Sequence, residues 1–212
     1  MDKQPYIELH AASSFSFLDG ASNPERLIER ASELELPSIA ITDRNGVYGA
    51  ARFHSRAKSI TAAGKTAPVA AHVGAEVSVS GLGARLSPPA HLPHAMADEP
   101  ARLTLLCATR TGYQNLCQLI TLYKLRAPAK QEGAATLEDL AQYAEGLVCL
   151  TGGDEGPLAA ALMRGGEAEG SRLLEQLIAL YGRQSVYVEL QRHHEREQEW
   201  RNQAAVRLAT RH

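Results

Sequence analysis

The chain has 212 residues, of which 44% are hydrophobic and 22% are charged, and its formal net charge at neutral pH is −2. This length suits one globular domain over residues 1–212. It excludes a complete template-directed polymerase, which needs several domains of about 100–150 residues each. Because the charge is nearly balanced, composition does not force a basic face, and any contact with nucleic acid has to be local.

The cysteine content and the apolar runs bear on the cell compartment. The chain has three cysteines, Cys107, Cys117 and Cys149, and no two of them form a CxxC pair. This pattern is typical of a reduced intracellular protein with free thiols. The first twenty residues lack the apolar run of a signal peptide, and no stretch approaches the roughly 20 apolar residues of a membrane span. We therefore expect a cytoplasmic protein that does not associate with membranes.

In the first part of the chain, short apolar strands alternate with amphipathic helices. Ser22 and Glu25 predict a capping box with Pro24 in the first helical turn, and Pro37 ends that helix. The predicted order is a strand at 6–10, a helix from about 24 to 34, a strand at 38–42, a helix at 48–63 and a strand at 68–77.

The second part begins with a break in this alternation. Residues 80–101 contain Gly, Pro and scattered His without a period, which predicts a surface hairpin or loop insertion. The alternation then resumes. It predicts a strand at 103–108, a helix capped at 111–114 and ending near 125, a short helix at 137–143, a strand at 146–151, two small helices within 156–180, a strand at 185–190 and a charged helix from about 195. Repeated strand and helix units with apolar strands predict an α/β fold around a parallel sheet, either a barrel or a doubly wound sheet.

Five polar residues stand at or just after predicted strands: His10, Asp19, Asp43, Glu76 and His193. In parallel α/β folds, functional side chains collect at the carboxyl ends of the strands. Imidazoles and carboxylates that converge there are the ligands of a hydrolytic centre with Zn²⁺, Mn²⁺ or Fe. The spacing therefore indicates a possible metal centre.

Each of these residues also has an ordinary structural interpretation. A histidine at a strand end is more often a hydrogen-bonding loop residue, and Asp19 and Asp43 precede glycine-containing turns. Glu76 is different because it lies in an otherwise apolar strand. An unpartnered carboxylate there would cost several kcal/mol, so Glu76 needs a partner or a metal.

The last helix carries arginines and glutamates together. Opposite charges stand at helical spacing in Arg192–Glu195 and Glu197–Arg201, which favours a solvated face stabilised by ion pairs. A DNA-binding stripe is the alternative.

Several segments together resemble a known family. They are 7–10 with 14–22, 40–43 with 46–49, 73–76, 103–106 with 111–116, 145–153 and 186–193. Their sequences, among them Ile-Glu-Leu-His, Ser-Phe-Ser-Phe-Leu-Asp-Gly-Ala-Ser and Ala-Ile-Thr-Asp, resemble the amino-terminal PHP (polymerase and histidinol phosphatase) domain of bacterial C-family DNA polymerases. Residues 154–158 and 189–194 are most similar to the error-prone alpha-subunit type.

The resemblance implies a fold and a biological setting. The fold is a PHP-type distorted (βα)7 barrel, and we expect it to be incomplete because the family's closing Asp-x-His motif follows a strand beyond His212. The full-length relatives are nucleotidyltransferases that carry out DNA-directed DNA synthesis in replication, DNA damage repair and translesion synthesis. The implied partners are the remainder of the polymerase polypeptide, DNA indirectly through it, and other repair or replication subunits.

The resemblance also implies a metal site, which is degraded in this sequence. The first family motif, His-x-His, ends here in Ala12, and the second, Thr-Asp-His, ends in Arg44. Arg102 and Gly153 stand where metal-binding members often carry His and Cys. The remaining ligands are His10, Asp19, Glu76 and His193.

Four ligands suffice for one ion at best, because a three-metal cluster shares about nine. We expect Arg44 to pair with Asp19 or Glu76 in the place of a metal, so that the protein holds no cofactor. If the residual site does bind an ion, we expect Zn, Mn or Mg. The sequence thus predicts a mainly structural PHP domain of an error-prone polymerase. The alternatives are an active metal-dependent phosphoesterase or 3′→5′ exonuclease and a stand-alone DNA-binding module.

Overall fold

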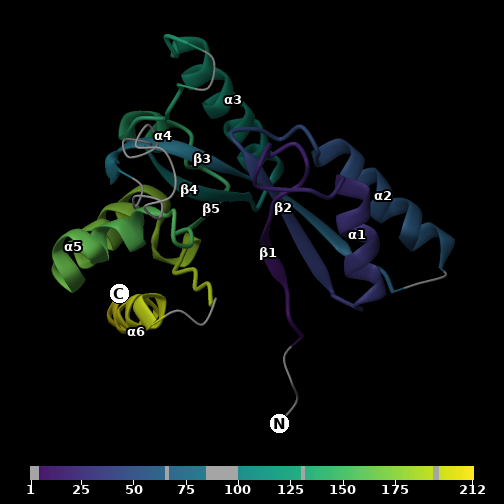
Figure 1. The fold of residues 1–212 in the computed structure, drawn as a ribbon. Helices are drawn as coiled ribbons and strands as arrows, with labels where there is room; N and C mark the ends of the chain where they lie inside the picture. Colours follow the sequence, from purple (N-terminus) through teal and green to yellow (C-terminus); the bar gives the residue numbers. More distant parts are fainter. Residues whose placement is uncertain (1–4, 65–66, 85–99, 130–131, 193–195) are drawn as a thin grey trace. The chain divides into compact units, whose positions relative to one another are not determined.

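The structure is a computed structural model that describes residues 5–64, 67–84, 100–129, 132–192 and 196–212 (Figure 1). The chain divides into two compact units, Met1–Glu76 and Val77–His212. We describe each unit by itself. That residues 1–212 act as one domain stays a prediction.

Unit 1 contains two parallel strand pairs. Its elements are β1 (Glu8–Ala11), α1 (Pro24–Glu33), β2 (Ser38–Arg44), α2 (Ala50–Ala63) and the first part of β3 (Ala70–Ala84). Strand β1 pairs with β2, and β2 pairs with β3 in a register that runs from Ser38 opposite Ala70 to Arg44 opposite Glu76. The predicted order of elements is confirmed.

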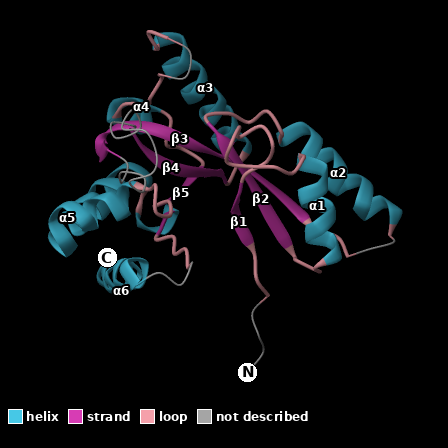
Figure 2. Cartoon of the chain, in the orientation of Figure 1, coloured by secondary structure: helices cyan, strands magenta, loops and turns pink. Residues whose placement is uncertain are grey.

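The core of unit 1 lies between its helices and its strands. Helices α1 and α2 lie side by side in Figure 2, and Ile28 and Phe53 on these helices are completely buried with Ile39 and Ile41 of β2. The helical spacing of apolar residues therefore buries one face of each helix.

The predicted cap of α1 is wrong in one detail. The residue before the helix is Asn23, and neither it nor Ser22 forms the capping box with Glu25; Pro24 does lie in the first turn. The carbonyl of Ser22 instead accepts a hydrogen bond from the Ser14 N–H, 2.8 Å away. Ser22 is thus part of the loop between β1 and α1.

Unit 2 continues β3 and adds the remaining elements. They are β4 (Pro100–Cys107), α3 (Arg110–Arg126), α4 (Leu137–Gln142), β5 (Leu147–Leu150), α5 (Pro157–Tyr181), a 3-10 turn (Arg183–Ser185), β6 (Val186–Tyr187) and α6 (Arg196–Arg211). Hydrogen-bonded neighbours follow chain order, so β3, β4, β5 and β6 are adjacent in this unit as β1, β2 and β3 are in unit 1. Six strands occur in the described residues.

The prediction of a wholly parallel sheet is wrong. Strands β4 and β5 are antiparallel, with Thr104 opposite Leu150 and Cys107 opposite Leu147. The six central residues of β4 are buried. Burial of both faces produces a continuous apolar run whatever the strand direction, so the run did not reveal that β4 is reversed.

Other boundaries in unit 2 shift by a few residues. Helix α3 is capped by Thr109, whose hydroxyl accepts the Gly112 N–H, and not at Thr111. Residues 80–84 and 100–101 belong to strands β3 and β4, so the predicted insertion is shorter, and residues 85–99 lie outside the described part. Strand β6 has only two residues.

The two helices predicted within 156–180 are confirmed as two helical segments of α5, separated by a kink at Gly165 and Gly166, whose backbone angles are not helical. The α/β fold class is confirmed.

The structure describes the three thiols and the apolar character of the helices. Cys107, Cys117 and Cys149 are free, and burial raises the pKa of the Cys107 thiol to about 12. None of the helices in the described part of the chain is both long enough and apolar enough to cross a membrane.

Candidate functional site

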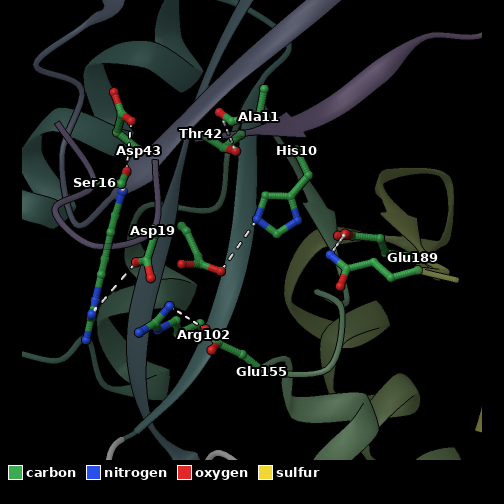
Figure 3. Close-up of polar contacts among 12 residues, drawn as sticks. His10, Ala11, Ser16, Asp19, Thr42, Asp43, Arg102, Glu155 and Glu189 are labelled. Carbon is green, nitrogen blue, oxygen red and sulfur yellow. Dashed lines mark hydrogen bonds and ion pairs between the residues drawn. The ribbon is translucent and has the colours of Figure 1, made fainter. Parts of the chain in front are cut away.

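His10 and Glu76 come together in unit 1. His10 is on β1 and Glu76 is on β3, where it lies opposite Arg44 of β2. The His10 Nε2 atom is 3.5 Å from Glu76 Oε1, and both side chains are mostly buried (Figure 3). The carboxylate in the apolar strand therefore has the partner that the sequence required.

Asp19 and Arg44 form a second, looser pair in unit 1. Arg44 Nη1 lies 3.9 Å from Oδ2 of Asp19, and about a third of each side chain is exposed. Asp19 is labelled in Figure 3. The Arg44 backbone N–H donates to Ser16 Oγ over 2.9 Å, which fixes the end of β2 against the loop after β1. The expected pairing of Arg44 with a neighbouring carboxylate is present at Asp19.

Asp43 has a role that the sequence did not reveal. Its carboxylate is almost completely buried and accepts three hydrogen bonds, from Ser13 N–H at 2.7 Å, Ser13 Oγ at 2.8 Å and Ser16 Oγ at 2.8 Å. Ser13 and Ser16 are buried as well. We call Ser13, Ser16 and Asp43 the serine anchor. Two serines spaced by three in a serine-rich loop were the only sequence signal for it.

The described residues do not fit the metal cluster that the family resemblance implies. No group of three or more His, Cys, Asp or Glu side chains within the described ranges is placed to hold an ion, whereas a catalytic zinc site takes three protein ligands. His193, the fourth predicted ligand, lies outside these ranges.

Unit 2 contains Arg102 and Gly153, the two residues that stand at further ligand positions of the family resemblance. Arg102 of β4 is 4% exposed and forms an ion pair with Glu155 (Figure 3). Its backbone N–H also donates to the Glu155 carbonyl oxygen over 3.2 Å. A guanidinium thus links β4 to the loop that contains Gly153.

A small cleft in unit 2 lies beside the same loop and is lined by residues of α5, α6 and the segment after β6. Its polar groups bond mainly to one another. Arg201 Nη2 is 2.5 Å from Asp154 Oδ1, Gln198 donates to the same carboxylate, and Gln191 donates to Glu189. The arrangement joins α6 to the loop and presents no nucleophile with a general base.

The arginines near the carboxyl end are used in ion pairs. Arg192 pairs with Glu199, Arg201 with Asp154, and Arg207 and Arg211 with Glu167. The partners expected from helical spacing, Glu195 and Glu197, have side chains outside the described set. Ion pairs of these arginines are therefore present, and the predicted pairs Arg192–Glu195 and Glu197–Arg201 stay predictions.

The PHP domain model matches residues 8–193. Error-prone DNA polymerase of Mycolicibacterium paratuberculosis is 35% identical over 208 residues, which cover 98% of this chain and 18% of that protein. Error-prone DNA polymerase of Anaeromyxobacter sp. strain K is 39% identical over 165 residues, 74% of this chain and 13% of that protein. The chain thus spans less than a fifth of the length of these relatives.

A solved structure supports the fold. A Bifidobacterium adolescentis protein named as a metal-dependent phosphoesterase superposes with a TM-score of 0.55 over 97% of this chain and 85% of its own. The two sequences are 11% identical, so this likeness concerns the fold alone.

Proposed function

We propose a function for this chain on the basis of its family, because the chain belongs to the PHP domain family. It is the amino-terminal PHP domain of an error-prone DNA polymerase, and it supports the DNA-synthesising parts of that polymerase without hydrolysing DNA itself. The full-length relatives that support this are named error-prone DNA polymerases. The proposed setting is repair and translesion synthesis after DNA damage in the bacterial cytoplasm, with other replication or repair subunits as partners.

One observation carries the proposal of a structural, metal-free site: the Arg44 guanidinium lies 3.9 Å from the Asp19 carboxylate. A divalent cation bound to Asp19 would face this positive charge. Two unit charges about 4 Å apart interact by about 4 kcal/mol at an effective dielectric constant of 20, and exposure of both side chains reduces that figure. Arg44 therefore opposes metal binding and neutralises Asp19.

The other carboxylates of unit 1 support the same proposal. Glu76 lies beside His10, and the Asp43 oxygens accept hydrogen bonds from the serine anchor. A metal that recruited Asp43 would have to break buried hydrogen bonds, each with a net value of about 1 kcal/mol. Protein groups thus satisfy the carboxylates without an ion.

The test measures metal content and nuclease activity together. We expect the purified protein to contain less than stoichiometric Zn, Mn or Mg and to show no 3′→5′ exonuclease activity with Mn²⁺ or Zn²⁺. Stoichiometric metal together with activity that His10→Ala abolishes would support the active phosphoesterase and overturn the structural proposal.

A gain-of-binding variant sharpens this test. The double substitution Ala12→His and Arg44→His adds two imidazoles and removes the guanidinium, so we expect it to bind Zn²⁺ or Mn²⁺ more tightly than the wild-type protein. The matched control is Arg26→His, which removes an exposed arginine of the Arg26–Glu29 pair on α1 and should leave metal binding unchanged. Equal metal binding in all three proteins would contradict the role given to Arg44.

The salt dependence of DNA affinity distinguishes the DNA-binding module from the structural domain. Because Arg192 and three arginines of α6, Arg201, Arg207 and Arg211, pair with carboxylates, we expect little affinity of residues 1–212 for DNA. Tight binding that weakens steeply between about 50 and 200 mM salt would favour the DNA-binding module, since phosphate contacts release counterions.

A further inference from the structure

The loop between β1 and α1 is fixed from within. The serine anchor holds its inner side, the Ser14 N–H bonds to the Ser22 carbonyl, and the N–H groups of Asp19 and Gly20 both bond to the Ser16 carbonyl. Gly20 has no room for a side chain, because a Cβ atom there would lie 2.2 Å from the Ser13 carbonyl oxygen. The loop therefore has a defined shape.

The outer side of the same loop is apolar and exposed. Phe15 is 41%, Phe17 81% and Leu18 89% exposed, and Tyr48 in the turn before α2 is 58% exposed. The chain has only three phenylalanines, and two of them are on this loop. We call Phe15, Phe17, Leu18 and Tyr48 the aromatic surface.

Two members of the aromatic surface, Phe15 and Tyr48, are held by neighbouring contacts in unit 1. The rings of Phe15 and Tyr48 are 6.3 Å apart between centroids, and the Arg52 guanidinium lies 5.9 Å from the Phe15 centroid. A Cβ atom at Gly46 would lie 2.2 Å from the Tyr48 ring, so Gly46 lets the ring lie across the turn. Fixed aromatic side chains lose little entropy when they become buried against a partner.

Leu18 adds an energetic argument. Its φ angle is 71°, a left-handed conformation that costs a residue with a Cβ about 1–2 kcal/mol. The side chain is almost fully exposed, so burial within unit 1 does not offset this cost. Strain kept at an exposed apolar residue is typical of binding surfaces.

The charges around the surface indicate the chemistry of its partner. Arg52 Nε pairs with Glu25 Oε1 at 2.5 Å, which also holds the pKa of the Glu25 carboxyl below its usual range, and Arg44 lies beside Asp19. The rim is therefore close to neutral. Nucleic-acid phosphates and anionic lipids require a basic surface, whereas an uncharged apolar protein surface fits an aromatic centre with a polar rim.

We propose that the aromatic surface docks onto an apolar face of another domain of the same polymerase polypeptide. The relatives are more than five times as long as this chain, so each polypeptide carries further domains that are covalently linked to its PHP domain. This linkage makes docking intramolecular and gives those domains a high effective concentration at the aromatic surface. This inference rests on the proposed function. It adds the place at which the PHP domain contacts the rest of the polymerase.

The test uses the full-length polymerase with the photo-crosslinking residue p-benzoylphenylalanine in place of Phe17. We expect crosslinks within one polypeptide to residues beyond His212. The control places the same residue at Leu125 of α3, which is 82% exposed and thus matches Phe17, and it should give at most a tenth of that crosslink yield. The proposal would be overturned by crosslinks that form only within residues 1–212, to a second copy or to another protein. It would also be overturned by equal yields at both positions, by the absence of any crosslink, or by a gene product that ends at His212.

A second measurement uses the substitutions Phe17→Ser and Leu18→Ser in the same full-length protein. We expect limited proteolysis to release the PHP domain several-fold faster, while the melting of residues 1–212 alone changes little because both side chains are exposed. An unchanged release rate would overturn the docking. DNA synthesis by the wild-type protein separates the two proposals: crosslinks without synthesis contradict the polymerase function, and synthesis without crosslinks contradicts the docking.

Discussion

The carboxylates of the candidate ligand set in unit 1 differ from the close carboxylate pairs of unit 2. In unit 1 the candidate ligands pair loosely, at 3.5 Å in His10–Glu76 and 3.9 Å in Asp19–Arg44, although Glu25 pairs closely with Arg52 between α1 and α2. In unit 2, Glu155 and Asp139 form close pairs with Arg102 and Arg126 that join separate elements. The loose pairs retain the composition of a ligand site, whereas the close pairs are structural links.

Asp43 departs from both patterns. It is buried in unit 1, and the hydrogen bonds described for its carboxylate come from serine hydroxyls and a backbone N–H. Such neutral donors fix a loop as firmly as a cation because each satisfies an otherwise buried lone pair. We therefore expect the serine anchor to contribute more to stability than the loose Asp19–Arg44 pair, and substitutions can test that difference.

The largest effect is expected for Asp43→Ala. The substitution removes three acceptor contacts and leaves the buried Ser13 and Ser16 hydroxyls without this partner, so unfolding free energy should fall by about 3–5 kcal/mol. Urea unfolding of residues 1–212 measures it. The matched control is Asp19→Ala, because Asp19 is a third exposed and loosely paired; it should cost less than about 1 kcal/mol. Equal losses would break the distinction between the anchor and the ion pairs.

Two arginines compare the units directly. Arg102→Leu leaves Glu155 without its closest cation and should destabilise the protein by about 2–4 kcal/mol, below the upper range for buried pairs because Glu155 is a third exposed. Arg44→Leu should change stability by less than about 1 kcal/mol, since its pair with Asp19 is long and solvated. Thermal unfolding of both variants measures the contrast. A larger loss for Arg44→Leu would show that the unit 1 pair is a structural link as well.

Much of the fold followed from sequence patterns. Apolar residues at helical spacing placed α1 and α2, and the buried runs placed β2 and β5, because burial of one or both faces leaves a period in the sequence. The direction of β4 left no such trace. Apolar content records burial, and strand direction depends on pairing with β5, which begins 40 positions after Cys107, the last residue of β4.

The site was predictable only where charge pointed to it. Arg44 in place of a ligand predicted a pair with Asp19 or Glu76, and the structure places it beside Asp19. The serine anchor joins residues 27 and 30 positions apart, and serine in a loop has too many ordinary roles to indicate a distant carboxylate. His193 stays a prediction.

A smaller effect is expected at Asp139, which closes the capping box of α4 with Thr136 and pairs with Arg126. Asp139→Asn should cost about 1 kcal/mol through the weakened cap. The Arg126 guanidinium holds the pKa of the Asp139 carboxyl below its usual range. The carboxylate's contribution is therefore complete above the unfolded-state pKa, near 4, and is lost as pH falls through the lower folded value. Unfolding curves of wild type and variant should converge below pH 4. A constant difference across that range would contradict this role.

The smallest effect is expected at Leu18, and its sign is opposite. Leu18→Gly relieves the left-handed backbone at φ 71°, while glycine increases the entropy of the unfolded chain, so residues 1–212 should gain at most about 1 kcal/mol. In the full-length polymerase, the same substitution removes an apolar contact from the aromatic surface and should speed proteolytic release of the domain. Urea unfolding and limited proteolysis together measure the two effects. A stabilised fragment in an unchanged polymerase would mean that the strain at Leu18 serves no contact between domains.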